Sequence, residues 1–150
     1  MDQHYRGDIR VDREFIVVRC VGNFIRKRRK QKLVADIYID GGTRGSRICL
    51  VDKSENKTIV KTRGGDPTNN EMEYLALLFA LDYINNRHKK DNVIIYSDSK
   101  LMVNQINGDW QVTTDHLQPL YDKCIKRMTD KIKIKWVRRD SNLAGIILED

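Results

Sequence analysis

Several features that define other classes of protein are scarce or missing in this sequence. The 150 residues include three cysteines, Cys20, Cys49 and Cys124, which lie far apart and form no Cys-x-x-Cys pair. We therefore expect neither a disulfide framework nor a zinc site. No apolar run approaches the roughly 20 residues that span a bilayer. The N-terminal stretch is too polar and charged for a signal peptide, so we expect a cytoplasmic protein with reduced thiols and no membrane contact.

The residues that are present are typical of one globular domain with an uneven charge. Apolar residues make up 40% and charged residues 33% of the chain, and the formal net charge is +7. Residues 1–35 hold ten Lys or Arg against four Asp or Glu, so nearly all the excess lies there, above all in residues 26–32. Such a block is typical of a tether for phosphate backbones and equally of a solvated tail, and both interpretations stay open. We divide the chain into a basic extension of unknown structure, residues 1–32, and a domain, residues 33–150.

The apolar pattern predicts a mixed sheet with helices packed on it. Three short runs separated by polar turns predict an antiparallel meander, and a later run without alternation predicts a central parallel strand. A meander followed by β-α units indicates an α/β fold, more strictly an α+β mixed sheet. Residues 14–21 could form another strand, but no partner for it can be identified. The expected strands are 33–40, 47–51, 57–61, 92–96 and 132–136, and the expected helical segments are 68–86, 100–107, 117–128 and 143–148.

Three carboxylates stand at the ends of these elements. Asp40 ends the first strand before two glycines, Asp98 follows the parallel strand, and Glu73 lies in the first turn of the intervening helix. An Asp before glycine is most often a turn former, and an acid in a first helical turn can merely complement the helix dipole. A right-handed crossover could bring all three to one edge of the sheet, where their repulsion calls for a cation. Mg²⁺ suits such oxygen ligands, and metal-assisted phosphodiester hydrolysis is the chemistry that follows.

Four stretches of the chain resemble the four motifs of type 1 ribonuclease H, in family order and spanning roughly residues 34–148. They are DGG at 40–42, TNNEMEYLALLFAL at 68–81, YSDSKLMVNQI at 96–106 and WVRRDSNLA at 136–144. The resemblance implies the ribonuclease H-like fold, a five-stranded mixed sheet with three antiparallel strands first and helices on both faces. It also implies hydrolysis of the RNA strand of an RNA/DNA hybrid with Mg²⁺ or Mn²⁺, and we expect a monomer.

The same resemblance implies roles for individual residues. Asp40 would bridge two metal ions, while Glu73 and Asp98 would hold one of them. The backbone at two glycines would lie where 2′-hydroxyl groups, which distinguish RNA from DNA, can be read. A threonine would contact a DNA phosphate and two asparagines would reach into the minor groove. The positions implied to bind substrate are Gly41, Gly42, Thr68, Asn69, Asn70, Lys100 and Asn142.

The chain departs from the family pattern at Gly145, which stands where the fourth carboxylate belongs. In the family that acid holds the metal that activates the water, so we expect its loss to weaken catalysis more than hybrid binding. Asp140 precedes the last helix and Glu149 lies one turn further on, so neither is a convincing substitute. The loop histidine of many members has no counterpart, and we expect His88 and His116 to be surface residues on helices.

Two hypotheses follow for the function. The first is an endonuclease acting on RNA/DNA hybrids, impaired to some degree by Gly145. The second is a ribonuclease H-like nucleic-acid-binding module that cuts poorly or not at all. Another nuclease or an integrase of the same superfold remains open, although the sequence Thr68-Asn69-Asn70 before Glu73 argues against it. A plain structural domain is least favoured, because burying three acids without a role would be costly.

Overall fold

The computed structural model describes residues 10–11, 15–20, 23–28 and 34–149, which fall in two compact units, Met1–Leu33 and Val34–Asp150. In the first unit, strands β1 (Arg10–Val11), β2 (Phe15–Cys20) and β3 (Asn23–Arg28) form an antiparallel sheet in the order β1-β2-β3. Strand β2, the described part of the apolar run at residues 14–21, thus has partners on both sides that its sequence did not identify. The basic block begins in β3, and its remainder lies outside the described residues.

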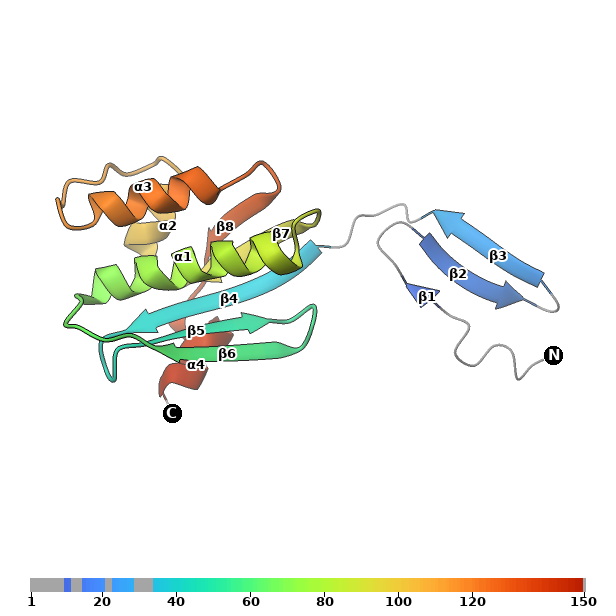
Figure 1. The fold of residues 1–150 in the computed structure, drawn as a ribbon, viewed down its shortest axis with the longest axis horizontal. Coiled ribbons are helices and arrows are strands. Elements are labelled where there is room, and N and C mark those ends of the chain that lie inside the picture. The colour runs from blue at the N-terminus through green and yellow to red at the C-terminus, as the bar shows by residue number, and fades with distance from the viewer. Residues whose placement is uncertain (1–9, 12–14, 21–22, 29–33, 150) are drawn as a thin grey trace. The chain divides into compact units, whose positions relative to one another are not determined.

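The second unit contains a five-stranded mixed sheet (Figure 1). Its order is β6-β5-β4-β7-β8; β5 pairs antiparallel with β4 and β6, and β7 pairs parallel with β4 and β8. The predicted meander and the predicted parallel strand are therefore confirmed. The strands are β4 (Val34–Gly42), β5 (Arg47–Asp52), β6 (Lys57–Thr62), β7 (Asn92–Ser97) and β8 (Ile132–Trp136).

Strand β4 runs further than its sequence pattern indicates. We expected it to end at Asp40, but Gly41 and Gly42 continue the ladder opposite Ile48 and Arg47 of β5. Backbone pairing with β5 therefore outweighs the turn tendency of the two glycines. The chain turns afterwards, through residues 43–46.

Four α-helices accompany the sheet: α1 (Asn69–Arg87), α2 (Lys100–Ile106), α3 (Gln118–Arg127) and α4 (Leu143–Glu149). At the start of α1, the Glu71 N–H donates to the Thr68 hydroxyl at 3.2 Å and the Thr68 N–H donates to the Glu71 carboxylate at 2.8 Å. This reciprocal capping box was predicted from the Thr-x-x-Glu spacing. None of the helices in the described parts of the chain is long and apolar enough to cross a membrane.

Alternate residues of β4 and β5 face two different helical layers. Ile37, Ile39 and Leu50 belong to the main core, which includes the buried side of α1. Tyr38 and Cys49, on the other face, pack in a second cluster with α4. Figure 1 accordingly shows α1 and α4 on opposite sides of the sheet. The carboxyl ends of β4 and β7 lie between these layers, and the first turn of α1 lies beside them.

Candidate active site

Asp40, Glu73 and Asp98 lie together at one edge of the sheet. Each offers a carboxylate oxygen, and these oxygens all lie within 4.8 Å of one another. Asp40 comes from β4, Asp98 follows β7, and Glu73 comes from the first turns of α1. Since β4 and β7 are parallel neighbours, their carboxyl ends meet at the same edge. The structure thus brings together the three acids that the sequence pattern indicated, and we call them the acid trio.

Gly41 allows α1 to approach β4 closely enough to place Glu73 beside Asp40. A Cβ atom at position 41 would collide with the backbone carbonyl of Met72 in α1. The Gly41 N–H donates to Glu73 Oε1 at 2.8 Å, so this predicted substrate-reading group already has a partner inside the protein. Gly42 differs, because a Cβ there would meet nothing within 4 Å.

Asn142 holds Asp98 of the acid trio through a partly buried hydrogen bond. It is fully buried, and its amide nitrogen donates to the Ile39 carbonyl at 2.9 Å and to Asp98 Oδ2 at 3.3 Å. Its side-chain oxygen accepts from the Ala144 N–H at 3.2 Å. These contacts are all internal to the protein, and the implied substrate-binding role of Asn142 stays a prediction. This residue ties α4 to β4 and orients Asp98.

The electrostatics of the acid trio favour a bound cation. Burial, followed by the charge of Asp40, raises the pKa of Glu73 to about 9. Burial, followed by the charge of Asp98, raises the pKa of Asp40 to about 6. Without a cation, Glu73 therefore keeps its proton near neutral pH, whereas Asp40 has largely lost its own. A set of closely spaced oxygen ligands whose charges repel one another fits a hard divalent cation such as Mg²⁺ or Mn²⁺.

Exposed polar residues surround the acid trio on the side of α1 and α2. Thr68, Asn69 and Asn70 are exposed where α1 begins, and Lys100 is exposed at the start of α2. Trp136 was not singled out from the sequence. Its indole N–H donates to the Asp98 carbonyl at 3.2 Å, the residue is 43% exposed, and Lys100 Nζ lies 5.0 Å from the ring centroid. The signal that was available is its position, as the last residue of an alternating strand.

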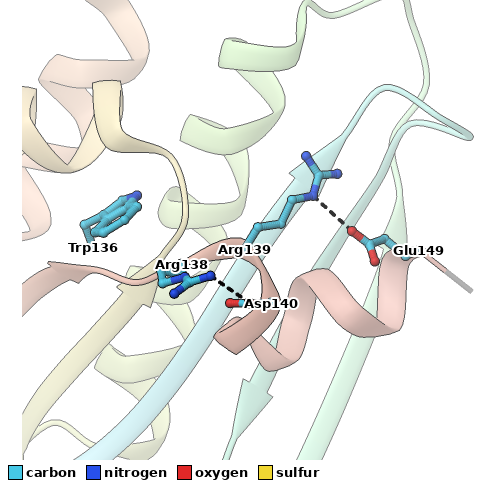
Figure 2. Close-up of a pocket in the computed structure, with 5 residues that line it drawn as sticks. All are labelled: Trp136, Arg138, Arg139, Asp140 and Glu149. Atoms are coloured by element: carbon cyan, nitrogen blue, oxygen red, sulfur yellow. Dashed lines mark hydrogen bonds and ion pairs between the residues drawn. The ribbon is translucent and has the colours of Figure 1, made fainter.

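Gly145 lies directly beside Asp98, on the α4 side of the acid trio. A Cβ built at this position would lie 3.3 Å from Asp98 Oδ2, so a carboxylate placed there would reach the trio. The two nearby acids are engaged elsewhere: Arg138 donates to Asp140 at 3.2 Å and Arg139 donates to Glu149 at 2.9 Å. These four residues and Trp136 line an open hollow (Figure 2).

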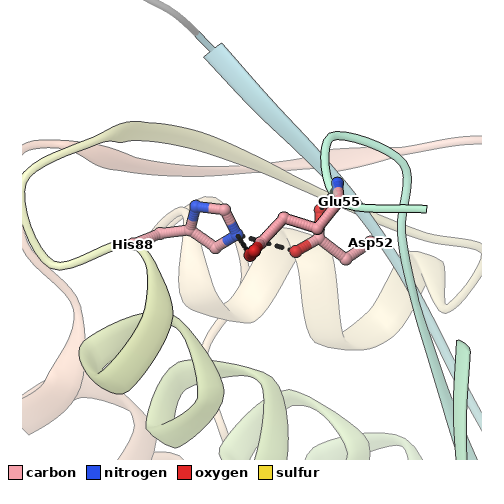
Figure 3. Close-up of side chains that lie close together, drawn as sticks. All are labelled: Asp52, Glu55 and His88. Atoms are coloured by element: carbon pink, nitrogen blue, oxygen red, sulfur yellow. Dashed lines mark hydrogen bonds and ion pairs between the residues drawn. The ribbon is translucent and has the colours of Figure 1, made fainter. Parts of the chain in front are cut away.

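Asp52, Glu55 and His88 form a second group of metal-ligating residue types (Figure 3). The two ring nitrogens of His88 lie 2.7 Å from Asp52 Oδ2 and 2.7 Å from Asp91 Oδ2. Burial alone would lower the pKa of His88, but these two carboxylates outweigh burial and raise it. An imidazolium that donates both protons has no lone pair for a metal, so we assign this group to the stability of the fold.

The surface position expected for His88 is therefore wrong. His88 is 3% exposed, because it caps α1 and turns its ring toward the end of β5. His116 is exposed, as expected, although it lies in the turn before α3 rather than in a helix.

Comparisons with known proteins agree with this geometry. A sequence model of the family described as reverse transcriptase-like matches residues 40–148, well over half of the chain. The chain belongs to this family, within the ribonuclease H-like superfamily. Its fold, a five-stranded mixed sheet with four α-helices, is the ribonuclease H-like fold that the motifs implied.

Solved ribonuclease H structures resemble this member over most of its length. The N-terminal RNase H domain of a Mycobacterium tuberculosis protein is 26% identical, with 77% of this chain and 95% of that chain covered and a TM-score of 0.62. RNase H1 from Halobacterium salinarum is 25% identical, with coverage of 77% and 94% and a TM-score of 0.61. The compost-derived LC11-RNase H1, solved in complex with an RNA/DNA hybrid, is 27% identical, with coverage of 73% and 88% and a TM-score of 0.64.

Proposed function

We propose that this domain is an endonuclease that hydrolyses the RNA strand of RNA/DNA hybrids with a divalent metal ion. The observation that carries the proposal is the convergence of Asp40, Glu73 and Asp98 within 4.8 Å at the carboxyl edge of the sheet. A bound Mg²⁺ or Mn²⁺ would activate the attacking water and stabilise the leaving oxygen. The likeness to a ribonuclease H1 solved with a hybrid supports this choice of substrate.

The residues of this chain would divide the remaining work. The acid trio would hold the ion, and Asn142 keeps Asp98 in place. Thr68, Asn69, Asn70, Gly42 and Lys100 form the surface on which a monomer would bind the hybrid. In the reaction, the water oxygen forms a bond to phosphorus, the bond from phosphorus to the leaving ribose oxygen breaks, and that oxygen receives a proton.

A second candidate function is a hybrid-binding module that cuts poorly or not at all. Gly145 favours it, because this position faces Asp98 and offers no carboxylate. The two functions share the same substrate surface and differ only in turnover, so binding alone does not separate them.

Cleavage of a labelled RNA/DNA hybrid in Mg²⁺ or Mn²⁺ tests the proposal on the full chain. We expect the original chain to cut the RNA strand and Asp40→Asn to abolish cutting. Asp109→Asn, at an exposed site after α2, is a matched control that should cut normally. A labelled DNA duplex should stay intact.

The variant Gly145→Asp separates the two functions. Cutting by the original chain supports the enzyme, and faster cutting by Gly145→Asp indicates that the missing acid limits it. Cutting by Gly145→Asp but not by the original chain indicates a nuclease fold that has lost its activity with the carboxylate at position 145. If neither protein cuts while both bind the hybrid tightly, the binding module is the correct function.

A further inference from the structure

An ion pair joins the two ends of the segment that contains Gly145, the residue beside Asp98. Arg139 lies in the short 3-10 helix at Arg139–Ser141, directly before α4, and its Nε donates to Glu149 Oε1 at 2.9 Å. Figure 2 shows the two side chains directed toward each other. Their side chains are 77% and 55% exposed. An ion pair this exposed is weak, so Arg139 can exchange Glu149 for another anion at little cost.

The location of Arg139 relates it to the acid trio. The Asn142 N–H donates to the Arg139 carbonyl at 3.2 Å, and the Asn142 side chain binds Asp98. Glu149 lies four residues after Gly145 and therefore on the same face of α4, and helical side chains lean toward the N-terminus. The hydrogen bond with Glu149, then the negative charge of Asp98, raises the pKa of Arg139. Asp98 of the acid trio is therefore one of the charges that stabilise the guanidinium.

We propose that Arg139 supplies the second positive charge of this site, so that the domain works with one bound divalent cation and an arginine instead of two cations. The inference rests on the proposed function. The three carboxylates of the acid trio carry three negative charges, which one divalent cation and the guanidinium of Arg139 balance once Arg139 has exchanged Glu149 for the site. A fourth carboxylate at position 145 would restore the charge that calls for a second cation.

An arginine can replace a second cation in stabilising negative charge on the phosphate. Its planar guanidinium donates to two phosphate oxygens at once, and a fixed donor stabilises the charge that develops on a phosphate during hydrolysis. It does not lower the pKa of a bound water as a metal does, so activation of the water falls to the single cation. This division of labour predicts slower cleavage than in a variant with four carboxylates.

The number of ions is counted by Mn²⁺ electron paramagnetic resonance on complexes of the full chain with hybrid, frozen before turnover. We expect the spectrum of an isolated Mn²⁺ ion from the original chain and that of a spin-coupled Mn²⁺ pair from Gly145→Asp. Asp40→Asn is the control and should lose the bound ion. A coupled pair in the original chain would overturn the inference.

The role of Arg139 is tested by single-turnover cleavage at saturating hybrid. Arg139→Gln should lower the rate roughly 10²-fold, the usual cost of removing one donor to a developing charge. The matched control Arg138→Gln removes the neighbouring exposed arginine, which pairs with Asp140, and should cost at most about threefold on that scale. In the Gly145→Asp background, Arg139→Gln should lower the cleavage rate no more than Arg138→Gln does, because a second cation replaces the guanidinium.

Equal effects of Arg138→Gln and Arg139→Gln would overturn the inference and leave the proposed function intact, provided that the original chain cuts the hybrid and needs Asp40. If neither the original chain nor Gly145→Asp cuts, the proposed function fails, and the inference fails with it.

Discussion

Gly41 sets the separation of α1 from β4 at the acid trio. Gly41→Ala would push the first turn of α1 away from the strand, because the new methyl group has no space beside Met72. We expect a loss of about 1–3 kcal/mol in the free energy of unfolding, the usual cost of overpacking. Mn²⁺ affinity should also fall, since Glu73 moves away from Asp40. Denaturant unfolding and calorimetric titration with Mn²⁺ measure the two effects.

Gly42→Ala is the matched control for that variant. It adds the same methyl group one residue later, where nothing lies within 4 Å, so stability and Mn²⁺ affinity should stay close to the original values. Equal behaviour of the two variants would contradict a packing role for Gly41.

The protonation of the acid trio predicts that metal binding depends on pH. Ligands must lose their protons to bind a cation, and the pKa values of Asp40 and Glu73 are raised to about 6 and about 9. Mn²⁺ affinity should therefore rise as the pH increases from 6 to 9, and binding near pH 7.5 should release about one proton. Titration calorimetry in buffers of different ionisation enthalpy measures that release. Glu73→Gln should abolish this proton release. If the original chain binds Mn²⁺ without releasing a proton, Glu73 is already ionised before the ion binds.

Helix α1 is fixed at both ends, and its C-terminal end depends on His88. The imidazolium bridges Asp52 and Asp91, and the hydroxyl of Tyr83 donates to Asp52 at 2.7 Å. His88→Ala would leave two buried carboxylates without their cation, which we expect to cost about 3–5 kcal/mol in the free energy of unfolding. Glu55→Gln removes an exposed partner of Arg87 and should cost less than about 1 kcal/mol. Chemical denaturation of both variants gives the comparison.

The loss of unfolding free energy caused by His88→Ala should depend on pH in one direction. His88 has a raised pKa in the folded state, so above pH 6.5 the folded chain keeps a proton that the unfolded chain has lost. Its contribution to stability is complete below pH 6.5 and declines as the pH rises through the folded pKa. The difference in unfolding free energy between the original chain and His88→Ala should therefore shrink at alkaline pH. A difference that grows with pH would contradict the imidazolium.

Local patterns in the sequence predicted the helices and strands, but they did not predict which side chains of different elements contact one another. The spacing of Thr68 and Glu71 predicted the capping box because both partners lie in one turn. The burial of His88 and Asn142 depends on carboxylates 36 and 44 positions away, which no local pattern reveals. For the same reason, Gly41 looked like a turn residue until α1 was found against it. The acid trio could be predicted because two of its acids lie at the carboxyl ends of strands, the third lies near the start of a helix, and the crossover rule brings these ends together.

At the scale of the whole molecule, charge separates the two units. The ten Lys or Arg and four Asp or Glu of residues 1–35 all lie before residue 33, and the rest of the chain is nearly neutral. We propose that residues 1–32 form a basic extension that tethers the domain to the phosphate backbone of its substrate. A tether of this kind adds affinity without adding sequence information.

Neutralising the basic block tests the tether in the full-length chain. Replacing its six Lys and Arg by Gln should weaken hybrid binding. It should also make the slope of log K against log salt concentration shallower by about 3 to 5, since each phosphate contact contributes about 0.9 to that slope on duplex DNA. The residues are Arg26, Lys27, Arg28, Arg29, Lys30 and Lys32. Fluorescence anisotropy of a labelled hybrid across a salt series measures both quantities.

A control variant distinguishes a tether from the effect of charge alone. Lys53, Lys89 and Lys90 are exposed at the edge of the sheet opposite the acid trio, and replacing them by Gln also lowers the net charge. Because a direct phosphate contact releases condensed counterions and a distant charge does not, this control should leave the salt slope nearly unchanged. If neutralising the basic block has as little effect on the slope as the control, residues 1–32 are a solvated tail, and hybrid affinity resides in the domain that carries the acid trio.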